Sequence, residues 1–132
     1  MWWKVLLFTL HAVTMCQAEN IHIGAVLSSM DNINTLRALV GRANTDMRVK
    51  AQGLTFNVTA QLMDSNPIRS ALSVCDDIIS QRVHVIVASH PPDSAQSPIS
   101  VSYTCGYYGV PLIGIFARDS AFSDKVNLLN FV

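Results

Sequence analysis

Three side chains that could together perform hydrolytic chemistry lie close in the sequence: Ser89, His90 and Asp93. A serine nucleophile, a histidine base and an aspartate that orients the base form the triad of many hydrolases. Triad members, however, come together through the fold and need an oxyanion site, and closeness in sequence supplies neither. Pro91 and Pro92 follow at once and stiffen the segment. The pattern therefore favours a rigid polar loop after a strand, and we expect no enzymatic activity.

Patterns for metals, cofactors and nucleic acid are also weak. The histidines are His11, His22, His84 and His90, and they lack the spacing of metal ligands. The glycine pairs in GYYG and IGIF do not form a phosphate-binding loop. Nine basic and nine acidic residues leave no net charge, so the composition does not attract nucleic acid or anionic lipid. We expect no metal, cofactor or nucleic-acid partner, and we expect His22 and His84 to have hydrogen-bond partners at strand positions.

The first 18 residues have the pattern of a secretory signal peptide. Lys4 supplies a cationic start, residues 5–13 are apolar, and Ala18 is a small residue suited to cleavage. The apolar stretch is shorter than the roughly 20 residues that a membrane helix needs. We therefore predict a signal peptide at 1–18, a single domain at 19–132, and no membrane segment in the chain.

Strand and helix patterns alternate along the rest of the chain. Residues 21–27 predict a first strand and residues 54–62 an edge strand with one polar face. Between them, helical spacing is kept by Ile33, Leu36, Val40, Ala43 and Met47, behind a cap at Asp31 or Asn32.

The second half of the chain continues the alternation. Asn66 as a cap and Pro67 at the first helical position predict a helix whose apolar stripe is Ile68, Ala71, Leu72, Cys75, Ile78 and Ile79. A strand at 83–88, a helix at 100–108, a strand at 112–115 and a possible fifth strand at 128–132 follow.

This alternation predicts the fold class α/β, with a doubly wound parallel sheet in the order 2-1-3-4-5. Half of the 132 residues are hydrophobic, which is enough for one buried core. The order places a switch point between the first and third strands, and therefore brings Ser28 and Ser29 beside Ser89 and His90. These four residues are a candidate edge for binding a small, amino-acid-like solute.

A secretory route gives meaning to two cysteines and one asparagine. Cys75 and Cys105 remain after signal cleavage, and either a disulfide between neighbouring helices or two separate buried thiols fits the sequence. Asn57 begins an N-glycosylation sequon, Asn-Val-Thr. In residues 54–62 the apolar and polar side chains alternate, so Asn57 is expected to point away from the apolar face.

Several blocks of the sequence resemble one family. NIHIGAVLSS, NVTA, ALSVCDDIIS, ASHPP, PISVSYTCGYYGVPLIGI and FSDKVNLLNF occur in this order. Together they resemble the amino-terminal domain of the obligatory, glycine-binding subunit of NMDA-type ionotropic glutamate receptors. The resemblance implies a clamshell of the periplasmic-binding-protein type I class, of which these residues form part of the first lobe. It also implies a fragment, whose agonist-binding domain and pore would lie outside the 132 residues.

The resemblance carries expectations about the site. In that family the first lobes of two subunits pack through the second and third helices, and small allosteric inhibitors bind at the junction. Tyr103, Tyr107 and Leu129 match positions at this junction, so the implied partner is a glutamate-binding NMDA receptor subunit. From the residues alone, a role in covering the core beneath a short helix is favoured over an interface for these tyrosines.

The resemblance also bears on modification and location. Cys75 matches a cysteine whose family partner lies beyond Val132, which leaves Cys105, where the family usually has a small residue, as the local alternative. Asn57 matches a family glycosylation position. The implied location is the extracellular, postsynaptic side of the plasma membrane within a receptor, or otherwise secretion or retention in the endoplasmic reticulum.

Overall fold

The computed structural model describes residues 19–89 and 98–115. Its elements are β1 (Glu19–Leu27), α2 (Met30–Thr45), α3 (Met47–Ala51), β2 (Leu54–Leu62), α4 (Pro67–Ser73), the π turn η1 (Val74–Ile78), the 3-10 turn η2 (Ile79–Gln81), β3 (Val85–Ser89), α5 (Ile99–Tyr108) and β4 (Leu112–Ile115). The predicted signal peptide and the predicted strand at 128–132 lie outside the described residues.

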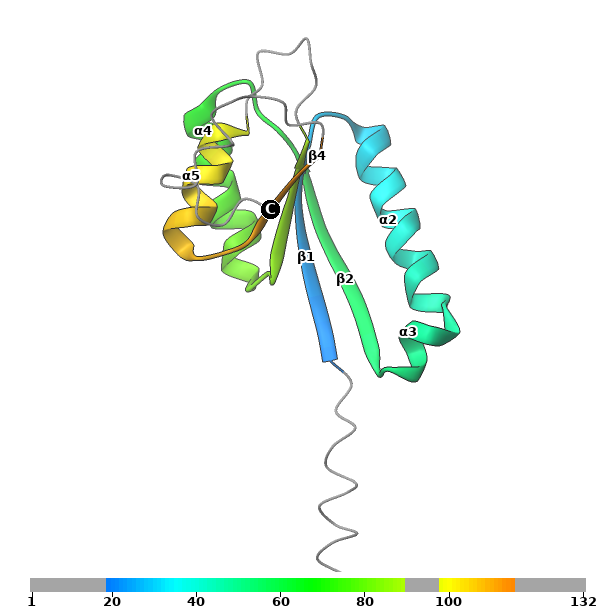
Figure 1. The fold of residues 1–132 in the computed structure, drawn as a ribbon. Helices are drawn as coiled ribbons and strands as arrows, with labels where there is room; N and C mark the ends of the chain where they lie inside the picture. Colours follow the sequence, from blue (N-terminus) through cyan, green and yellow to red (C-terminus); the bar gives the residue numbers. More distant parts are fainter. Residues whose placement is uncertain (1–18, 90–97, 116–132) are drawn as a thin grey trace, which may run out of the picture.

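The four strands form one parallel sheet in the order β2-β1-β3-β4, which confirms the predicted fold class and the order of these four strands. Figure 1 shows α2 and α3 on one side of the sheet, and α4 and α5 together on the other. Two faces covered by helices are the normal arrangement for a parallel sheet, because its strands are buried on both sides.

Local signals explain where the helices begin. The predicted cap of α2 is wrong: Ser29 caps it, with extended backbone and a side chain that accepts a hydrogen bond from the Asn32 N–H. Asp31 and Asn32 already lie inside the helix. Met47 belongs to α3, which starts after its own cap, Asp46. Asn66 caps α4 and Pro67 takes the first helical position, as predicted.

The predicted apolar stripe of the fourth helix is partly wrong. Ile68 and Leu72 are 69% and 58% exposed, whereas Ser70, Val74 and Ile78 are buried. The buried residues are four positions apart, as on one side of a helix, and this side begins with the polar Ser70. The α-helix itself ends at Ser73, where the π turn η1 begins.

Ser70 can face the core because its polar group has partners. Its hydroxyl donates to the Asp64 carbonyl at 3.0 Å and accepts from the Asp64 N–H at 3.2 Å. A buried hydroxyl with both roles satisfied carries little desolvation penalty. A polar residue therefore occupies an inner position of α4 that the predicted apolar stripe does not include.

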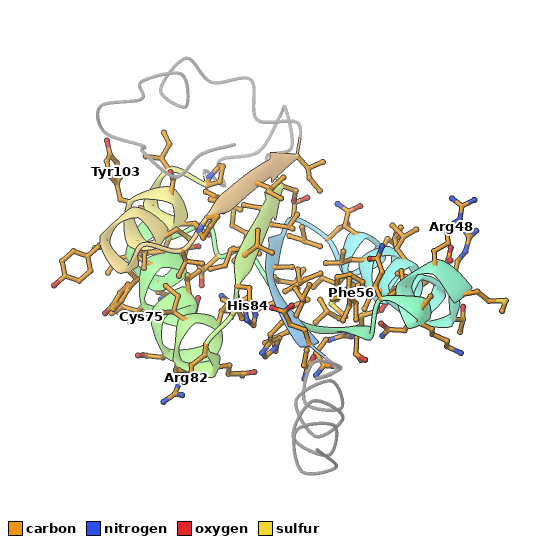
Figure 2. All side chains as sticks on the ribbon, turned by 60° about the horizontal axis from the view of Figure 1, so that its bottom comes forward. Arg48, Phe56, Cys75, Arg82, His84 and Tyr103 are labelled. Carbon is orange, nitrogen blue, oxygen red and sulfur yellow. The ribbon has the colours of Figure 1, made fainter. Side chains whose placement is uncertain are left out.

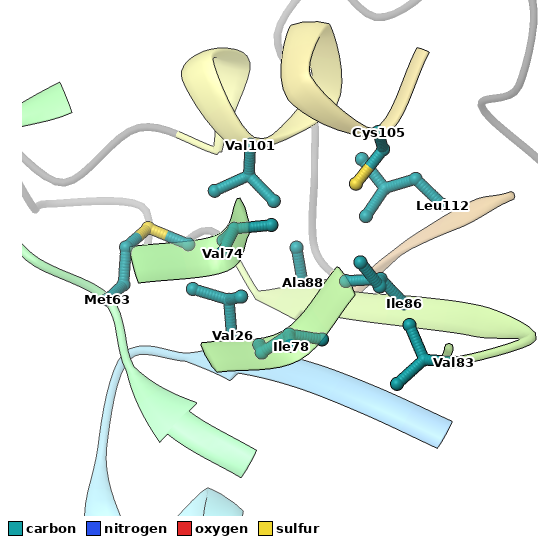
Figure 3. Packing of buried hydrophobic residues seen from close by; sticks show 10 residues of the cluster. All are labelled: Val26, Met63, Val74, Ile78, Val83, Ile86, Ala88, Val101, Cys105 and Leu112. Carbon is teal, nitrogen blue, oxygen red and sulfur yellow. The ribbon is translucent and has the colours of Figure 1, made fainter. Parts of the chain in front are cut away.

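The larger hydrophobic core lies between the sheet and the helices α4 and α5. Figure 3 shows its ten buried residues, which are Val26, Met63, Val74, Ile78, Val83, Ile86, Ala88, Val101, Cys105 and Leu112. Gly24 lets η1 approach β1 closely, since a Cβ at this position would overlap Ile78 and press on Ile86. The buried residues described on the other face are Ala25, Leu27 and Ile33.

The α2 face is covered over only part of its width. Helix α2 packs on β2 and β1, and among the described residues no helix lies over β3 and β4 on this side. Ile113 and Ile115 of β4 are consequently 43% and 38% exposed. We call this region the open half-face, made of Val87, Ile113 and Ile115.

Candidate functional site

Exposed apolar side chains gather on the outer side of the helix pair α4–α5. We define this helix-pair surface by Ile68, Leu72, Tyr103, Tyr107 and Tyr108, which are between 49% and 84% exposed. The two helices pack against each other, and Figure 1 shows them side by side. Grouped aromatic and aliphatic side chains on a protein surface mark contact sites.

The sequence of α5 separates an inner from an outer side. Val101 and Cys105, four residues apart, are fully buried. Tyr103 and Tyr107 have the same spacing on the outside, where their exposed fractions are 56% and 84%. Residues four apart lie on one side of a helix, so this pattern presents both rings in one direction. Gly109 ends the helix at a positive φ of 67°.

Tyr108 connects α5 to η1, the turn that follows α4. The Cys75 thiol donates a hydrogen bond to the Tyr108 hydroxyl at 3.1 Å, and this contact raises the pKa of Tyr108. The Tyr108 ring meets the Tyr107 ring edge-on, with centroids 5.0 Å apart and planes at 84°. Figure 2 shows Tyr103 on α5 and Cys75 on η1, the turn that follows α4, both on the opposite side of the sheet from the Phe56 side chain.

The two cysteines have different surroundings. Both are free thiols, so the local bridge between Cys75 and Cys105 is not formed in this structure. Cys105 is fully buried, and burial raises its pKa to about 12, so it remains a protonated core residue. Cys75 is half-buried beside the surface, and a partner beyond Val132 remains a prediction.

The switch-point edge has the predicted neighbours, but its hydroxyls are occupied. The Ser28 N–H donates to Ser89 Oγ at 2.8 Å, and Ser89 Oγ donates to Ser28 Oγ at 3.1 Å. Asn32 Nδ2 donates to Ser28 Oγ at 3.4 Å, while Ser29 caps α2. The topology thus brings Ser28 and Ser89 together as the sequence predicts, and ligand binding there remains a prediction.

A cavity of about 210 Å³ opens beside this edge, on the α2 face. It is lined by Leu27, Asn32, Thr35, Leu36, Leu39, Val87, Ser89 and Ile115. None of these residues is charged, and five are aliphatic. The cavity therefore suits an apolar group better than the charged ends of an amino acid.

The two described histidines form a hydrogen-bonded pair at the start of β3. The His22 N–H donates to His84 Nδ1 at 3.0 Å, and the His84 N–H donates to the His22 carbonyl at 2.8 Å. His22 Nε2 lies 2.8 Å from Thr59 Oγ1. Both are thus satisfied as predicted, with His22 in β1 and His84 just before β3. Within residues 19–89 and 98–115 no three potential ligands gather to hold a metal ion.

Three other predicted residues remain predictions. Asn57 is exposed on β2, as a glycan acceptor must be. Leu129 and His90 lie outside the described residues, as does Asp93 of the serine, histidine and aspartate cluster.

Comparison with known proteins gives the relationship. No family model matches the chain. A Drosophila grimshawi protein named glutamate [NMDA] receptor subunit 1 is 42% identical over 105 residues, 79% of this chain and 11% of that relative. The protein of the same name from Drosophila ananassae is 37% identical over 134 residues, 93% of this chain and 14% of that relative. The chain is homologous to NMDA receptor subunit 1.

The chain matches only a small part of each relative. The chain spans only about a tenth of the length of the NMDA receptor subunits that it matches. These relatives are named as receptor subunits and not as enzymes, which agrees with a non-catalytic chain. In the part of the chain that the structure describes, no helix is long and apolar enough to cross a membrane.

Two residues of the helix-pair surface were missed by the sequence reasoning. The apolar stripe predicted for α4 includes Ile68 and Leu72, but both side chains are exposed. The four-residue spacing of Ser70, Val74 and Ile78 was the signal for the true inner side, and it was hidden because Ser70 is polar. The contact site predicted on α5 therefore extends onto α4, where Ile68 and Leu72 are exposed.

Proposed function

We propose that this chain forms a non-catalytic extracellular module of an NMDA-type receptor subunit, which pairs with another subunit and thereby modulates the channel. The observation that carries the proposal is the helix-pair surface, where five apolar side chains remain exposed over a core of ten buried residues. The homology to NMDA receptor subunit 1 supports a role in receptor assembly.

The composition of the surface fits subunit pairing. Tyrosine gives a large rigid contact area with one polar end, and Tyr103 and Tyr107 are both exposed on this surface. Leu72 on α4 adds an aliphatic neighbour. In protein interfaces, a few aromatic residues shielded from water contribute most of the binding free energy.

The proposed partner is a glutamate-binding NMDA receptor subunit, on the extracellular side of the plasma membrane after passage through the secretory pathway. A small allosteric ligand would bind at the edge of the same junction, in contact with Tyr103 and Tyr107. Leu129 is proposed as a further contact, by its match to the family position.

The test is a binding measurement between this chain and the amino-terminal domain of a glutamate-binding subunit. Tyr107→Ala and Leu72→Ser are expected to weaken binding at least tenfold, about 1.4 kcal/mol each. Leu39→Ser is the matched control, because Leu39 is 53% exposed on α2 at the opposite face. Equal effects of Leu72→Ser and Leu39→Ser would contradict the proposed surface.

A second candidate function is favoured by the cavity beside Ser89. In this alternative, the switch-point edge binds a small solute, with Ser28, Ser29, Ser89 and His90 around it. Isothermal titration with glycine and glutamate tests it: saturable heat that is lost in Ser89→Val would favour solute binding. We expect no saturable heat, since the Ser28 and Ser89 hydroxyls bond each other and no charged residue lines the cavity.

A further inference from the structure

The outer strand β2 has an edge that could accept another strand. It lies at the end of the sheet, and its nine residues pair with β1 without a bulge from Leu54 to Leu62. The sequence LTFNVTAQL holds no charged residue, no proline and no glycine. Natural edge strands usually carry charges, prolines or bulges that prevent pairing with a second chain, and this strand has none of them.

The last turn of α2 provides a different kind of protection. Asn44 Nδ2 donates to the Phe56 carbonyl at 2.8 Å, and Asn44 Oδ1 accepts from the Phe56 N–H at 2.8 Å. One side-chain amide thus satisfies both main-chain groups of one strand residue. These are the two bonds that a residue of a neighbouring strand would make.

The bonding pattern of β2 shows that Phe56 faces the open edge. The Glu19 N–H donates to the Gly53 carbonyl, and the Met63 N–H donates to the Leu27 carbonyl. The main-chain N–H and C=O groups of odd-numbered residues therefore point toward β1. Successive residues of a strand bond in opposite directions, which places Phe56 and Val58 on the outer side. Asn44 therefore occupies the position that an added strand would take.

We propose that Asn44 is a guard residue that closes the edge of β2 against the β2 strand of a second copy of this chain. Two identical edges fit each other as an antiparallel pair about a two-fold axis, in which each contributes the same residues. Removing the Asn44 amide frees the main-chain groups of Phe56 and makes this uncharged strand available for pairing. The inference is independent of the function proposed for the helix-pair surface, which lies on the other face.

The first experiment measures the mass of the full chain by light scattering, in protein produced without glycans. Asn44→Ala is expected to associate at least tenfold more strongly than the wild type. Asn32→Ala, another α2 asparagine with side-chain bonds, is the control and should behave as the wild type. Thr55→Lys, which adds a charge to an exposed position of β2, should restore wild-type behaviour when combined with Asn44→Ala.

Hydrogen exchange of the wild type provides a second readout that does not depend on the folding of a variant. The Phe56 N–H is expected to exchange at least tenfold more slowly than the Val58 N–H. Equal exchange at the two positions would overturn the proposal. Association of Asn44→Ala that Thr55→Lys fails to reverse would overturn it as well, because the contact would then lie elsewhere.

Discussion

The two faces of the sheet differ in how completely they are covered. On one face, α4, η1 and α5 enclose ten buried residues and still present apolar side chains outward. On the other, α2 covers β2 and β1, encloses Ala25, Leu27 and Ile33, and leaves the open half-face beside a cavity. The exposed apolar residues of α4 and α5 therefore differ in origin from those of β4. Those on α4 and α5 lie outside a core of ten buried residues, whereas those on β4 lie on a sheet face that the described helices cover only in part.

The difference matters for assigning function. An apolar side chain over a complete core gains nothing inside its own domain, so its exposure points to a partner. An apolar side chain on a half-covered parallel sheet is an ordinary core position that lacks its covering layer. For this reason the helix-pair surface, and not the cavity on the α2 face, carries the proposed function.

The largest expected difference between the faces is in the free energy of unfolding after core truncation. Ile78→Ala should cost about 4 kcal/mol, because its neighbours are held by helices and strands and cannot collapse into the space. Ile33→Ala should cost about 2 kcal/mol, since its surroundings beside the cavity can relax. Urea denaturation with unchanged slopes measures both values. Equal losses would show that the two cores are equally well packed.

A pair of glycines gives the next largest effect, with opposite signs. Gly24→Ala would place a methyl group against Ile78 and Ile86 and should cost about 1–3 kcal/mol. Gly41 in α2 has no atom within 4 Å of its would-be Cβ, so Gly41→Ala should stabilise by about 0.5–1 kcal/mol. Calorimetry should show melting temperatures that move in opposite directions. A stabilising Gly24→Ala would mean that η1 does not approach β1 closely.

The free energy of unfolding should depend on pH through the Cys105 thiol, which lies in the larger core. Burial raises its pKa from 9.0 to about 12, so above pH 9 the unfolded chain ionises this thiol while the folded chain does not. Stability from this residue is fully present below pH 9 and should be about 1 kcal/mol lower at pH 10. Urea midpoints from pH 8 to pH 10 check this. Cys105→Ala should flatten the curve.

The smallest effect is expected at Asn57, in an uncovered part of the sheet. Expression in a eukaryotic secretory pathway should add one glycan, which Asn57→Gln removes and gel mobility reveals. Because the side chain is exposed, the substitution should change the free energy of unfolding by less than about 0.5 kcal/mol. An unmodified wild-type chain, or a large loss of stability, would indicate that Asn57 is covered.

Much of the fold could be predicted because local patterns were strong. Alternation in β2 predicted both its bounds and its place at the edge, and the position of that edge gave the order of the four described strands. The inner side of α4 could not be predicted, because it depends on the bonds of the Ser70 hydroxyl to Asp64 and on the π turn that follows. The first inner position, Ser70, is polar, so a stripe drawn from apolar residues alone does not find the inner side.

The candidate site was predicted unevenly. Tyr103 and Tyr107 came from the resemblance to a family, and their exposure is compatible with it. Ile68 and Leu72 could be assigned to the same surface only once the packing of α4 on α5 was known. The cavity beside Ser89 depends on which part of a sheet face remains without a helix, and no residue pattern encodes this.

The position of β1 between β2 and β3 sets the order in which the sheet can form during synthesis. The Asn44 and Phe56 bonds join residues 12 positions apart, whereas Ser28 and Ser89, at the ends of β1 and β3, are 61 positions apart. At translation rates of about 5–20 residues per second, β3 leaves the ribosome about one to five seconds after β2. Asn44 is made before β2, so its amide is available to bond Phe56 during this interval. The inner edge of β1 is the strand surface that stays unpaired until β3 has emerged.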